Sequence, residues 1–203
     1  MLLWYVGIKN RETVMVPITF RFHPQKTIEA AAMFLKLHGK PMKYLGLLKM
    51  LYIADRIALD RMEQPITGDC AYSMKYGPVL SGVYDLIKGQ NANDALPLWS
   101  KYIGKSDNDK NFVELLANPN DDYLCEEEEE IIQEVYAQFG HLNPFDVAEW
   151  THGLPEWQNP PENSCIPIVV DDVLRCLNKT DEDIEYIRQI EAREAYLDGV
   201  LAT

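Results

Sequence analysis

The chain has 203 residues, of which 47% are hydrophobic and 25% charged, and its formal net charge is −13. This length suits one domain with one hydrophobic core, and no apolar run approaches the roughly 18 residues of a membrane-spanning helix, so we expect no membrane association. Residues 1–88 carry 12 Lys and Arg against 7 Asp and Glu, whereas residues 89–203 carry 7 against 25. The acidic half argues against nucleic acid and favours a basic protein partner, although solubility alone would also explain it.

Two helices are predicted in the N-terminal third. Residues 1–23 contain stretches of alternating apolar residues, so an N-terminal arm or an edge strand is expected there. From Pro24 the apolar residues follow the helical period, and Gly39 ends that helix. Pro41 then fits the first turn of a second helix, which runs to about Arg61 and is apolar on nearly every face.

Extended chain is predicted next. Between Pro65 and Gly77 small or polar residues alternate with larger ones, which favours a short strand or hairpin, with turn-forming residues at 67–69. Pro78 is expected to open a third helix that ends at Gly89.

The following segments are predicted to be a loop, a strand and a helix. Residues 90–110 are rich in Asn, Asp, Gly, Lys and Ser, which is typical of a loop. Residues 112–117 are expected to form a strand that pairs with residues 70–76. Because acidic residues stabilise the first turn of a helix, the run Glu126–Glu130 predicts a helix, which ends at Gly140.

Two N-cap patterns mark the last helices. Asn143 followed by Pro144 predicts a short helix to about His152, and Thr180 with Asp183 predicts the final helix. The sum is a mainly α fold, a single-domain helical bundle with a small antiparallel β element, over residues 24–203.

Motifs for cofactors and metals are missing from the sequence. It has no Gly-rich phosphate-binding loop and no two His at zinc-ligand spacing, and its four Cys are scattered without a C-x-x-C pair. We therefore predict no cofactor and no metal. The Cys are expected to be reduced thiols in a cytoplasmic protein.

Asp55 is the residue that most requires an explanation, because it lies inside the nearly all-apolar second helix. One hypothesis makes Asp55 or His152 the acid–base group of a small hydrolase. The hypothesis we favour makes Asp55 a structural anchor, which pairs with Lys75 or accepts a hydrogen bond from Tyr76.

Several aromatic residues would bury a large area while keeping a polar group, as residues in protein interfaces do, although packing in the core is the alternative. They are Tyr72, Tyr76, Tyr84, Trp150 and Trp157.

A set of motifs follows in order along the chain. They are Leu51-Tyr52, Ala54-Asp55, Pro65–Asp69, Lys75–Val79, Tyr84-Asp85, Glu149–His152 and Trp157. Over about residues 25–157 they resemble the Panacea antitoxin domain, also called the SocA-like or phage-associated GepA-like family. The resemblance implies a mostly helical bundle with a small β element. It also implies an antitoxin of a toxin–antitoxin pair, a class whose members bind unrelated toxins directly and often occur on mobile elements. Residues 1–23 are too short and too strand-like for the DNA-binding helix-turn-helix of some members.

Two sets of residues are assigned on these grounds. Those expected to bind the partner are Lys75, Tyr76, Tyr84 and Trp157. Those expected to hold the fold are Asp55, Pro65, Gly68, Gly77, Pro78, Trp150 and His152.

The leading functional hypothesis is a non-enzymatic antitoxin that binds a cognate protein toxin, expected to be basic, and occludes its working surface. One alternative is a proteolytic adaptor that delivers its partner to an ATP-dependent protease, with the acidic tail from Asp181 as a second contact surface. The other is the small hydrolase that uses Asp55 or His152.

Overall fold

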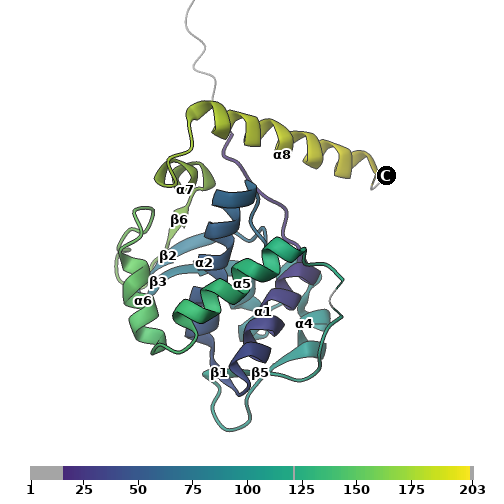
Figure 1. Cartoon of the computed structure of the whole chain (residues 1–203), viewed down its shortest axis with the longest axis vertical. Helices are drawn as coiled ribbons and strands as arrows, with labels where there is room; N and C mark the ends of the chain where they lie inside the picture. Colours follow the sequence, from purple (N-terminus) through teal and green to yellow (C-terminus); the bar gives the residue numbers. More distant parts are fainter. Residues whose placement is uncertain (1–15, 121, 202–203) are drawn as a thin grey trace, which may run out of the picture.

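The computed structural model describes residues 16–120 and 122–201. It confirms a mainly α fold with a small β element (Figure 1). The helices are α1 Pro24–His38, α2 Tyr44–Met62, α3 Ser81–Lys88, the 3-10 helix η1 Ala92–Asp94, α4 Leu96–Tyr102, α5 Glu126–Phe139, α6 Pro144–His152, α7 Val170–Cys176 and α8 Asp181–Leu201. The strands are β1 Met42–Lys43, β2 Ala71–Met74, β3 Gly77–Leu80, β4 Ile103–Lys105, β5 Phe112–Leu115 and β6 Ile166–Ile168.

Helix α2 forms the centre of the core. It packs against α5, α6 and β3, and its residues from Gly46 to Asp55 are all buried. A helix that is apolar on nearly every side needs such neighbours on every side, so the predicted burial of this segment is confirmed. Figure 1 shows α8 across one end of the molecule and β1 and β5 at the opposite end, with α2 between them.

Two small antiparallel sheets are present in the described residues. One has the strand order β1-β5-β4, with Met42 opposite Val113, and the other has the order β3-β2-β6. The predicted strand is confirmed as β2. It forms a hairpin with β3 whose tip is Lys75–Tyr76, because Met74 pairs with Gly77, so the predicted turn residues 67–69 are not the turn of this hairpin. The predicted pairing of β5 with residues 70–76 is wrong, since β5 pairs with β1 and β4 instead.

The predicted caps set several helix ends. Gly39 has φ 69° and donates its N–H to Leu35 O at 3.0 Å, which ends α1. The side chain of Asn143 accepts from Phe145 N at 3.0 Å and begins α6. Thr180 and Asp183 form a reciprocal pair before α8, with Thr180 N to Asp183 Oδ2 at 2.9 Å and Asp183 N to Thr180 Oγ1 at 3.1 Å.

Three predicted elements are corrected. Pro41 does not begin α2, because Met42 and Lys43 pair with β5 first. Pro78 lies in β3 and not in a helix, so α3 starts at Ser81. Residues 90–110 contain η1, α4 and β4, where a loop was expected, since Trp99 and Ile103 are buried.

The end of the N-terminal region lies against the C-terminal helices. The segment 16–23 has no strand; the rest of the predicted arm, residues 1–15, lies outside the described residues. Ile18 is buried, and its N–H donates to Asp171 Oδ2 at 2.9 Å at the start of α7. Arg188 of α8 contacts both Val16 O and Asp171, so α7 and α8 hold this segment in place.

Candidate functional site

Asp55 anchors the loop that follows α2. It is buried, its Oδ1 accepts from Thr67 N at 2.9 Å and its Oδ2 accepts from the Thr67 hydroxyl. Burial raises the pKa of Asp55 to about 7, although its hydrogen bonds with Thr67 act in the other direction. The expected pairing with Lys75 or Tyr76 is wrong, because both residues lie exposed at the hairpin tip while the 65–69 loop returns beside Asp55.

Thr67 and Asp69 extend this contact to α3. The Thr67 hydroxyl oxygen accepts from Asp69 N at 3.1 Å. The Asp69 carboxylate in turn accepts from Gly82 N at 3.0 Å and Val83 N at 2.9 Å, where it caps α3 from outside the helix. Two carboxylates and one hydroxyl thus tie α2, the 65–69 loop and α3 together.

Gly68 and Gly77 lie at close backbone approaches. Gly68 has φ 65°, and a Cβ there would lie 1.9 Å from Arg21 O. Gly77 has φ 88°, and a Cβ there would lie 2.3 Å from Thr151 Oγ1 and 3.2 Å from Lys49 Nζ. Both positions require glycine on grounds of space as well as of φ.

Lys49 was not singled out in the sequence, yet its side chain is fully buried. Its Nζ donates to Pro78 O at 2.5 Å, and burial lowers its pKa to about 7. Pro78 therefore contributes a carbonyl acceptor to the core, where sequence analysis expected a helix start.

A buried ion pair joins α2 to the segment after α6. Arg56 Nε donates to Glu156 Oε1 at 2.7 Å, and the Tyr52 hydroxyl donates to the same oxygen at 2.9 Å. Glu156 carries no signal in the sequence, because no local pattern marks the partner of an arginine a hundred residues away.

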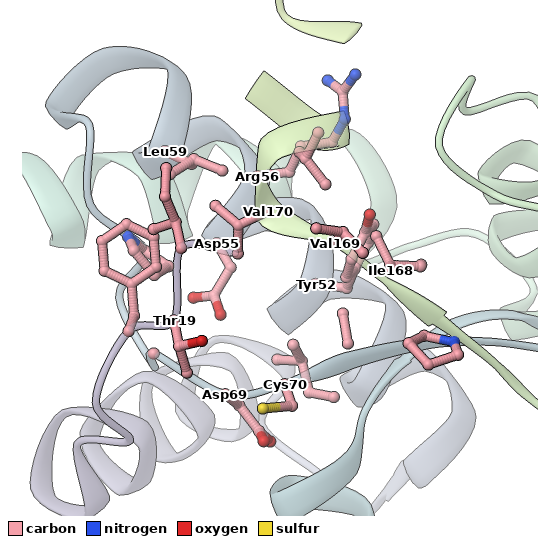
Figure 2. Close-up of a pocket in the computed structure, with 18 of the residues that line it drawn as sticks. Thr19, Tyr52, Asp55, Arg56, Leu59, Asp69, Cys70, Ile168, Val169 and Val170 are labelled. Atoms are coloured by element: carbon pink, nitrogen blue, oxygen red, sulfur yellow. The ribbon is translucent and has the colours of Figure 1, made fainter. Parts of the chain in front are cut away.

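A cavity of about 210 Å³ lies beside Asp55. Figure 2 shows the Asp55 carboxyl group directed between Thr19 and the strand end at Ile168–Val170, with Asp69 and Cys70 below it. Burial and the Asp69 carboxylate both raise the pKa of the Cys70 thiol, which disfavours a nucleophilic thiolate. No histidine is among the described residues that line this cavity.

The second acid–base candidate, His152, lies in a different environment. Its ring stacks on Trp157 at 4.1 Å, its Nδ1 lies 3.2 Å from Glu149 Oε2, and its buried Nε2 has no hydrogen-bond partner in the described part of the chain. Trp157 Nε1 donates to Met74 O at 3.2 Å. The contacts of His152 and Trp157 hold the end of α6 against the hairpin, and Trp157 is not among the residues that line the surface groove described next.

The other three residues expected to bind the partner lie in one surface groove of about 940 Å³. Its lining includes Lys75, Tyr76 and Tyr84. Nothing in the sequence marks several other residues of the lining, which come from β1, the start of α2 and the start of α6. They are Lys43, Tyr44, Leu45, Leu48 and Phe145. The loop 159–165 completes the lining.

The remaining fold residues have ordinary packing roles. Pro65 lines the Asp55 cavity, and Trp150 is 46% exposed with its ring 4.8 Å from that of Phe139. No cluster of three or more His, Cys, Asp or Glu that could hold a metal ion occurs in residues 16–120 and 122–201. Over the same residues, no helix has the length and apolar character to cross a membrane.

The comparison with protein families gives one match. Residues 47–158 match the family described as antitoxin SocA-like, Panacea domain. No curated protein and no solved structure matches the chain. The matched range covers more than half of the sequence and contains most of α2, the Asp55–Thr67–Asp69 contacts, the hairpin and α6. The chain therefore belongs to the SocA-like Panacea antitoxin family.

Proposed function

We propose that this protein is an antitoxin that neutralises a cognate protein toxin by binding it directly and covering its working surface. Family membership supports the antitoxin role. The observation that carries the direct-binding mechanism is the groove, where Tyr76 and Phe145 are about half exposed and their rings pack edge to face at 6.1 Å. Exposed aromatic residues around a groove are typical of protein interfaces.

Binding fits the arrangement better than catalysis does. Three buried or partly buried polar residues of the matched range are engaged within the fold: Asp55 accepts from Thr67, Asp69 caps α3, and Lys49 donates to Pro78 O. A hydrolase would need a base within reach of a nucleophile. Cys70, the thiol beside Asp55, has a raised pKa and no histidine next to it in the lining of the cavity.

The cytoplasm is the proposed location. The free cysteines Cys70, Cys125 and Cys165 are exposed, which suits a reducing compartment.

A growth assay tests the proposal. A neighbouring gene whose expression alone stops growth is expressed at a fixed level while the antitoxin is titrated. We expect growth to be restored only when the antitoxin reaches stoichiometric amounts. Tyr76→Ala should require about tenfold more protein, as for the loss of an interface hot spot. Tyr123→Ala is the matched control, because Tyr123 is 52% exposed against 50% for Tyr76 and does not line the groove.

The half-life of the toxin separates occlusion from delivery to a protease. Under occlusion, toxin half-life stays the same with and without the antitoxin. A shortened half-life that depends on an ATP-dependent protease would favour the adaptor alternative. Full protection at substoichiometric antitoxin, with toxin half-life unchanged, would contradict the binding mechanism and favour an enzyme.

A further inference from the structure

Three lysines surround the aromatic wall of the groove, and each has its Nζ over a ring. Lys43 Nζ lies 4.8 Å from the centre of the Phe145 ring, and Lys75 Nζ lies 5.7 Å from that of Tyr76. Lys88 Nζ, at the rim, lies 4.3 Å from the Tyr44 ring and 5.1 Å from the Tyr84 ring. Each lysine is therefore held beside the groove in a defined position.

These lysines form no ion pair with a carboxylate of the described residues, whereas several more buried charges do. Glu156 is paired with Arg56, Asp171 with Arg188 and Glu128 with Lys26. In a chain of net charge −13, three neighbouring lysines without acidic partners are an unusual local excess of positive charge. Glu162, in the loop 159–165, is the single carboxylate in the described lining of the groove.

The Tyr44 hydroxyl helps to keep Lys88 charged. Lys88 Nζ donates to this hydroxyl at 2.9 Å. Although burial acts against it, the hydroxyls of Tyr44 and Tyr84 raise the pKa of Lys88 above its ordinary value. The positive charge at this end of the groove therefore persists throughout the physiological pH range.

The floor between the lysines is apolar. Leu45, Leu48, Met74 and Val79 contribute to it. A volume of about 940 Å³ is at the upper end of the range of about 300–1,000 Å³ for small-molecule pockets, so the groove has room for several residues of an extended peptide.

We propose that this groove binds an acidic segment of the neutralised protein, with carboxylates on Lys43, Lys75 and Lys88 and an aromatic or long aliphatic side chain on the floor between them. The proposal rests on the proposed function and adds the chemistry of the partner segment. The partner segment is therefore acidic, whereas the net charge of the chain suggests a basic partner. The local charge at the contact surface decides which charges pair.

Two other occupants fit the groove less well. Single-stranded nucleic acid would need open aromatic faces for base stacking, but the Nζ groups of Lys43 and Lys88 already lie over the rings. The second is the acidic helix α8 of another copy of the chain. In each copy α8 lies at the end of the molecule opposite β1 (Figure 1). Its own contacts also hold it down, since Ile184 and Ile187 are buried and Asp198 pairs with Arg21 at 2.5 Å.

The test is a selection from a random 12-residue peptide library displayed on phage, with the full chain immobilised. We expect the enriched peptides to be acidic and to contain an aromatic or long aliphatic residue. Their affinity should fall at least tenfold in Lys43→Glu/Lys75→Glu/Lys88→Glu and between about 0.05 and 0.5 M salt. The matched control is Lys101→Glu, because Lys101 Nζ also lies over a ring, that of Tyr102 at 4.7 Å, but Lys101 is not among the residues that line the groove.

Several results would overturn the proposal. In the peptide selection, these are enrichment of basic peptides, no enrichment at all, or equal enrichment on the triple variant when its circular dichroism spectrum is unchanged. Binding of a 12-nucleotide single strand that depends on the three lysines would also overturn it. So would a wild-type dimer in sedimentation that is lost in the triple variant. Because no toxin is used, failure here leaves the growth assay of the proposed function unaffected, and a failed growth assay leaves this result unaffected.

Discussion

At the scale of single residues, Thr67 and Gly68 explain why the loop after α2 has one conformation. Thr67 donates twice to Asp55 and accepts from Asp69 N, and Gly68 brings the backbone next to Arg21 O. The family motif Pro65–Asp69 is thus accounted for by hydrogen bonds and lack of space, and catalysis is not needed to explain it.

Gly68→Ala is expected to destabilise the fold much more than Gly39→Ala. The two glycines have nearly the same φ, 65° and 69°, so both substitutions cost about 1 kcal/mol of backbone strain. A Cβ at Gly39 would meet no atom within 4 Å, whereas one at Gly68 would meet backbone at 1.9 Å and should cost a further ~2 kcal/mol or more. Urea denaturation of both variants measures the difference in the free energy of unfolding. Equal losses of stability would show that the backbone at Arg21 does not lie as close to Gly68 as described.

Asp55→Asn is expected to change how stability depends on pH. The native pKa of Asp55 is about 7 and its unfolded value about 3.8, so between these pH values the native state holds a proton that the unfolded chain has released. The free energy of unfolding of the wild type, minus that of Asp55→Asn, should therefore fall by about 3–4 kcal/mol from pH 4 to pH 7. Above about pH 7 this difference should stay nearly constant. Denaturant unfolding at a series of pH values measures this difference, and a difference independent of pH would contradict the account.

At the scale of elements, local signals and distant contacts can be separated. The ends of α1, α5 and α6 and the start of α8 follow from caps, prolines and charges near them in the chain, and these were predicted. Helices α4 and α7 have seven residues each, too few for a clear period, and form where Trp99 and Leu174 are buried by distant segments. Strand partners such as β1 with β5 depend in the same way on contacts between distant residues.

The groove likewise combines residues that the sequence indicates with residues that only the fold brings together. Lys75, Tyr76 and Tyr84 belong to one family motif region, and the structure places them in one groove. Lys43 and Phe145 reach that groove from β1 and α6, which no spacing in the sequence could show. Trp157 was assigned to the same set, but it contacts His152 and Met74 and is not among the residues that line the groove.

Arg188→Ala is expected to loosen α8 while leaving the core folded. Arg188 is mostly buried and contacts Val16 O, Asp171 and Glu185, so its loss leaves Asp171 without its ion-pair partner. We expect a loss of about 2–4 kcal/mol from the docking of α8, seen as faster trypsin cleavage after Arg193.

The control for α8 is Arg175→Ala. Arg175 pairs with Asp172, and the two side chains are 48% and 60% exposed, so the substitution should cost less than about 1 kcal/mol. If Arg188→Ala and Arg175→Ala were cleaved at the same rate, the contacts of Arg188 would not be what holds α8 in place.

At the scale of the whole molecule, charge is separated by location. Acidic residues are concentrated in the first turn of α5 and along α8, whereas three lysines gather at the groove on the hairpin and α6 side. The net charge of −13 therefore says little about the partner of any one surface. The two halves of the sequence predict the separation, and the structure shows where each sign is exposed.

The central claim is that the groove binds the toxin directly. Its most direct test is calorimetric titration of the purified toxin with the wild-type protein, Tyr76→Ala and Tyr123→Ala. The account predicts a stoichiometric complex for all three, with Kd raised at least about tenfold by Tyr76→Ala and unchanged by Tyr123→Ala. Equal affinities for Tyr76→Ala and the wild type, or no complex with a toxin that the protein neutralises in cells, would contradict it.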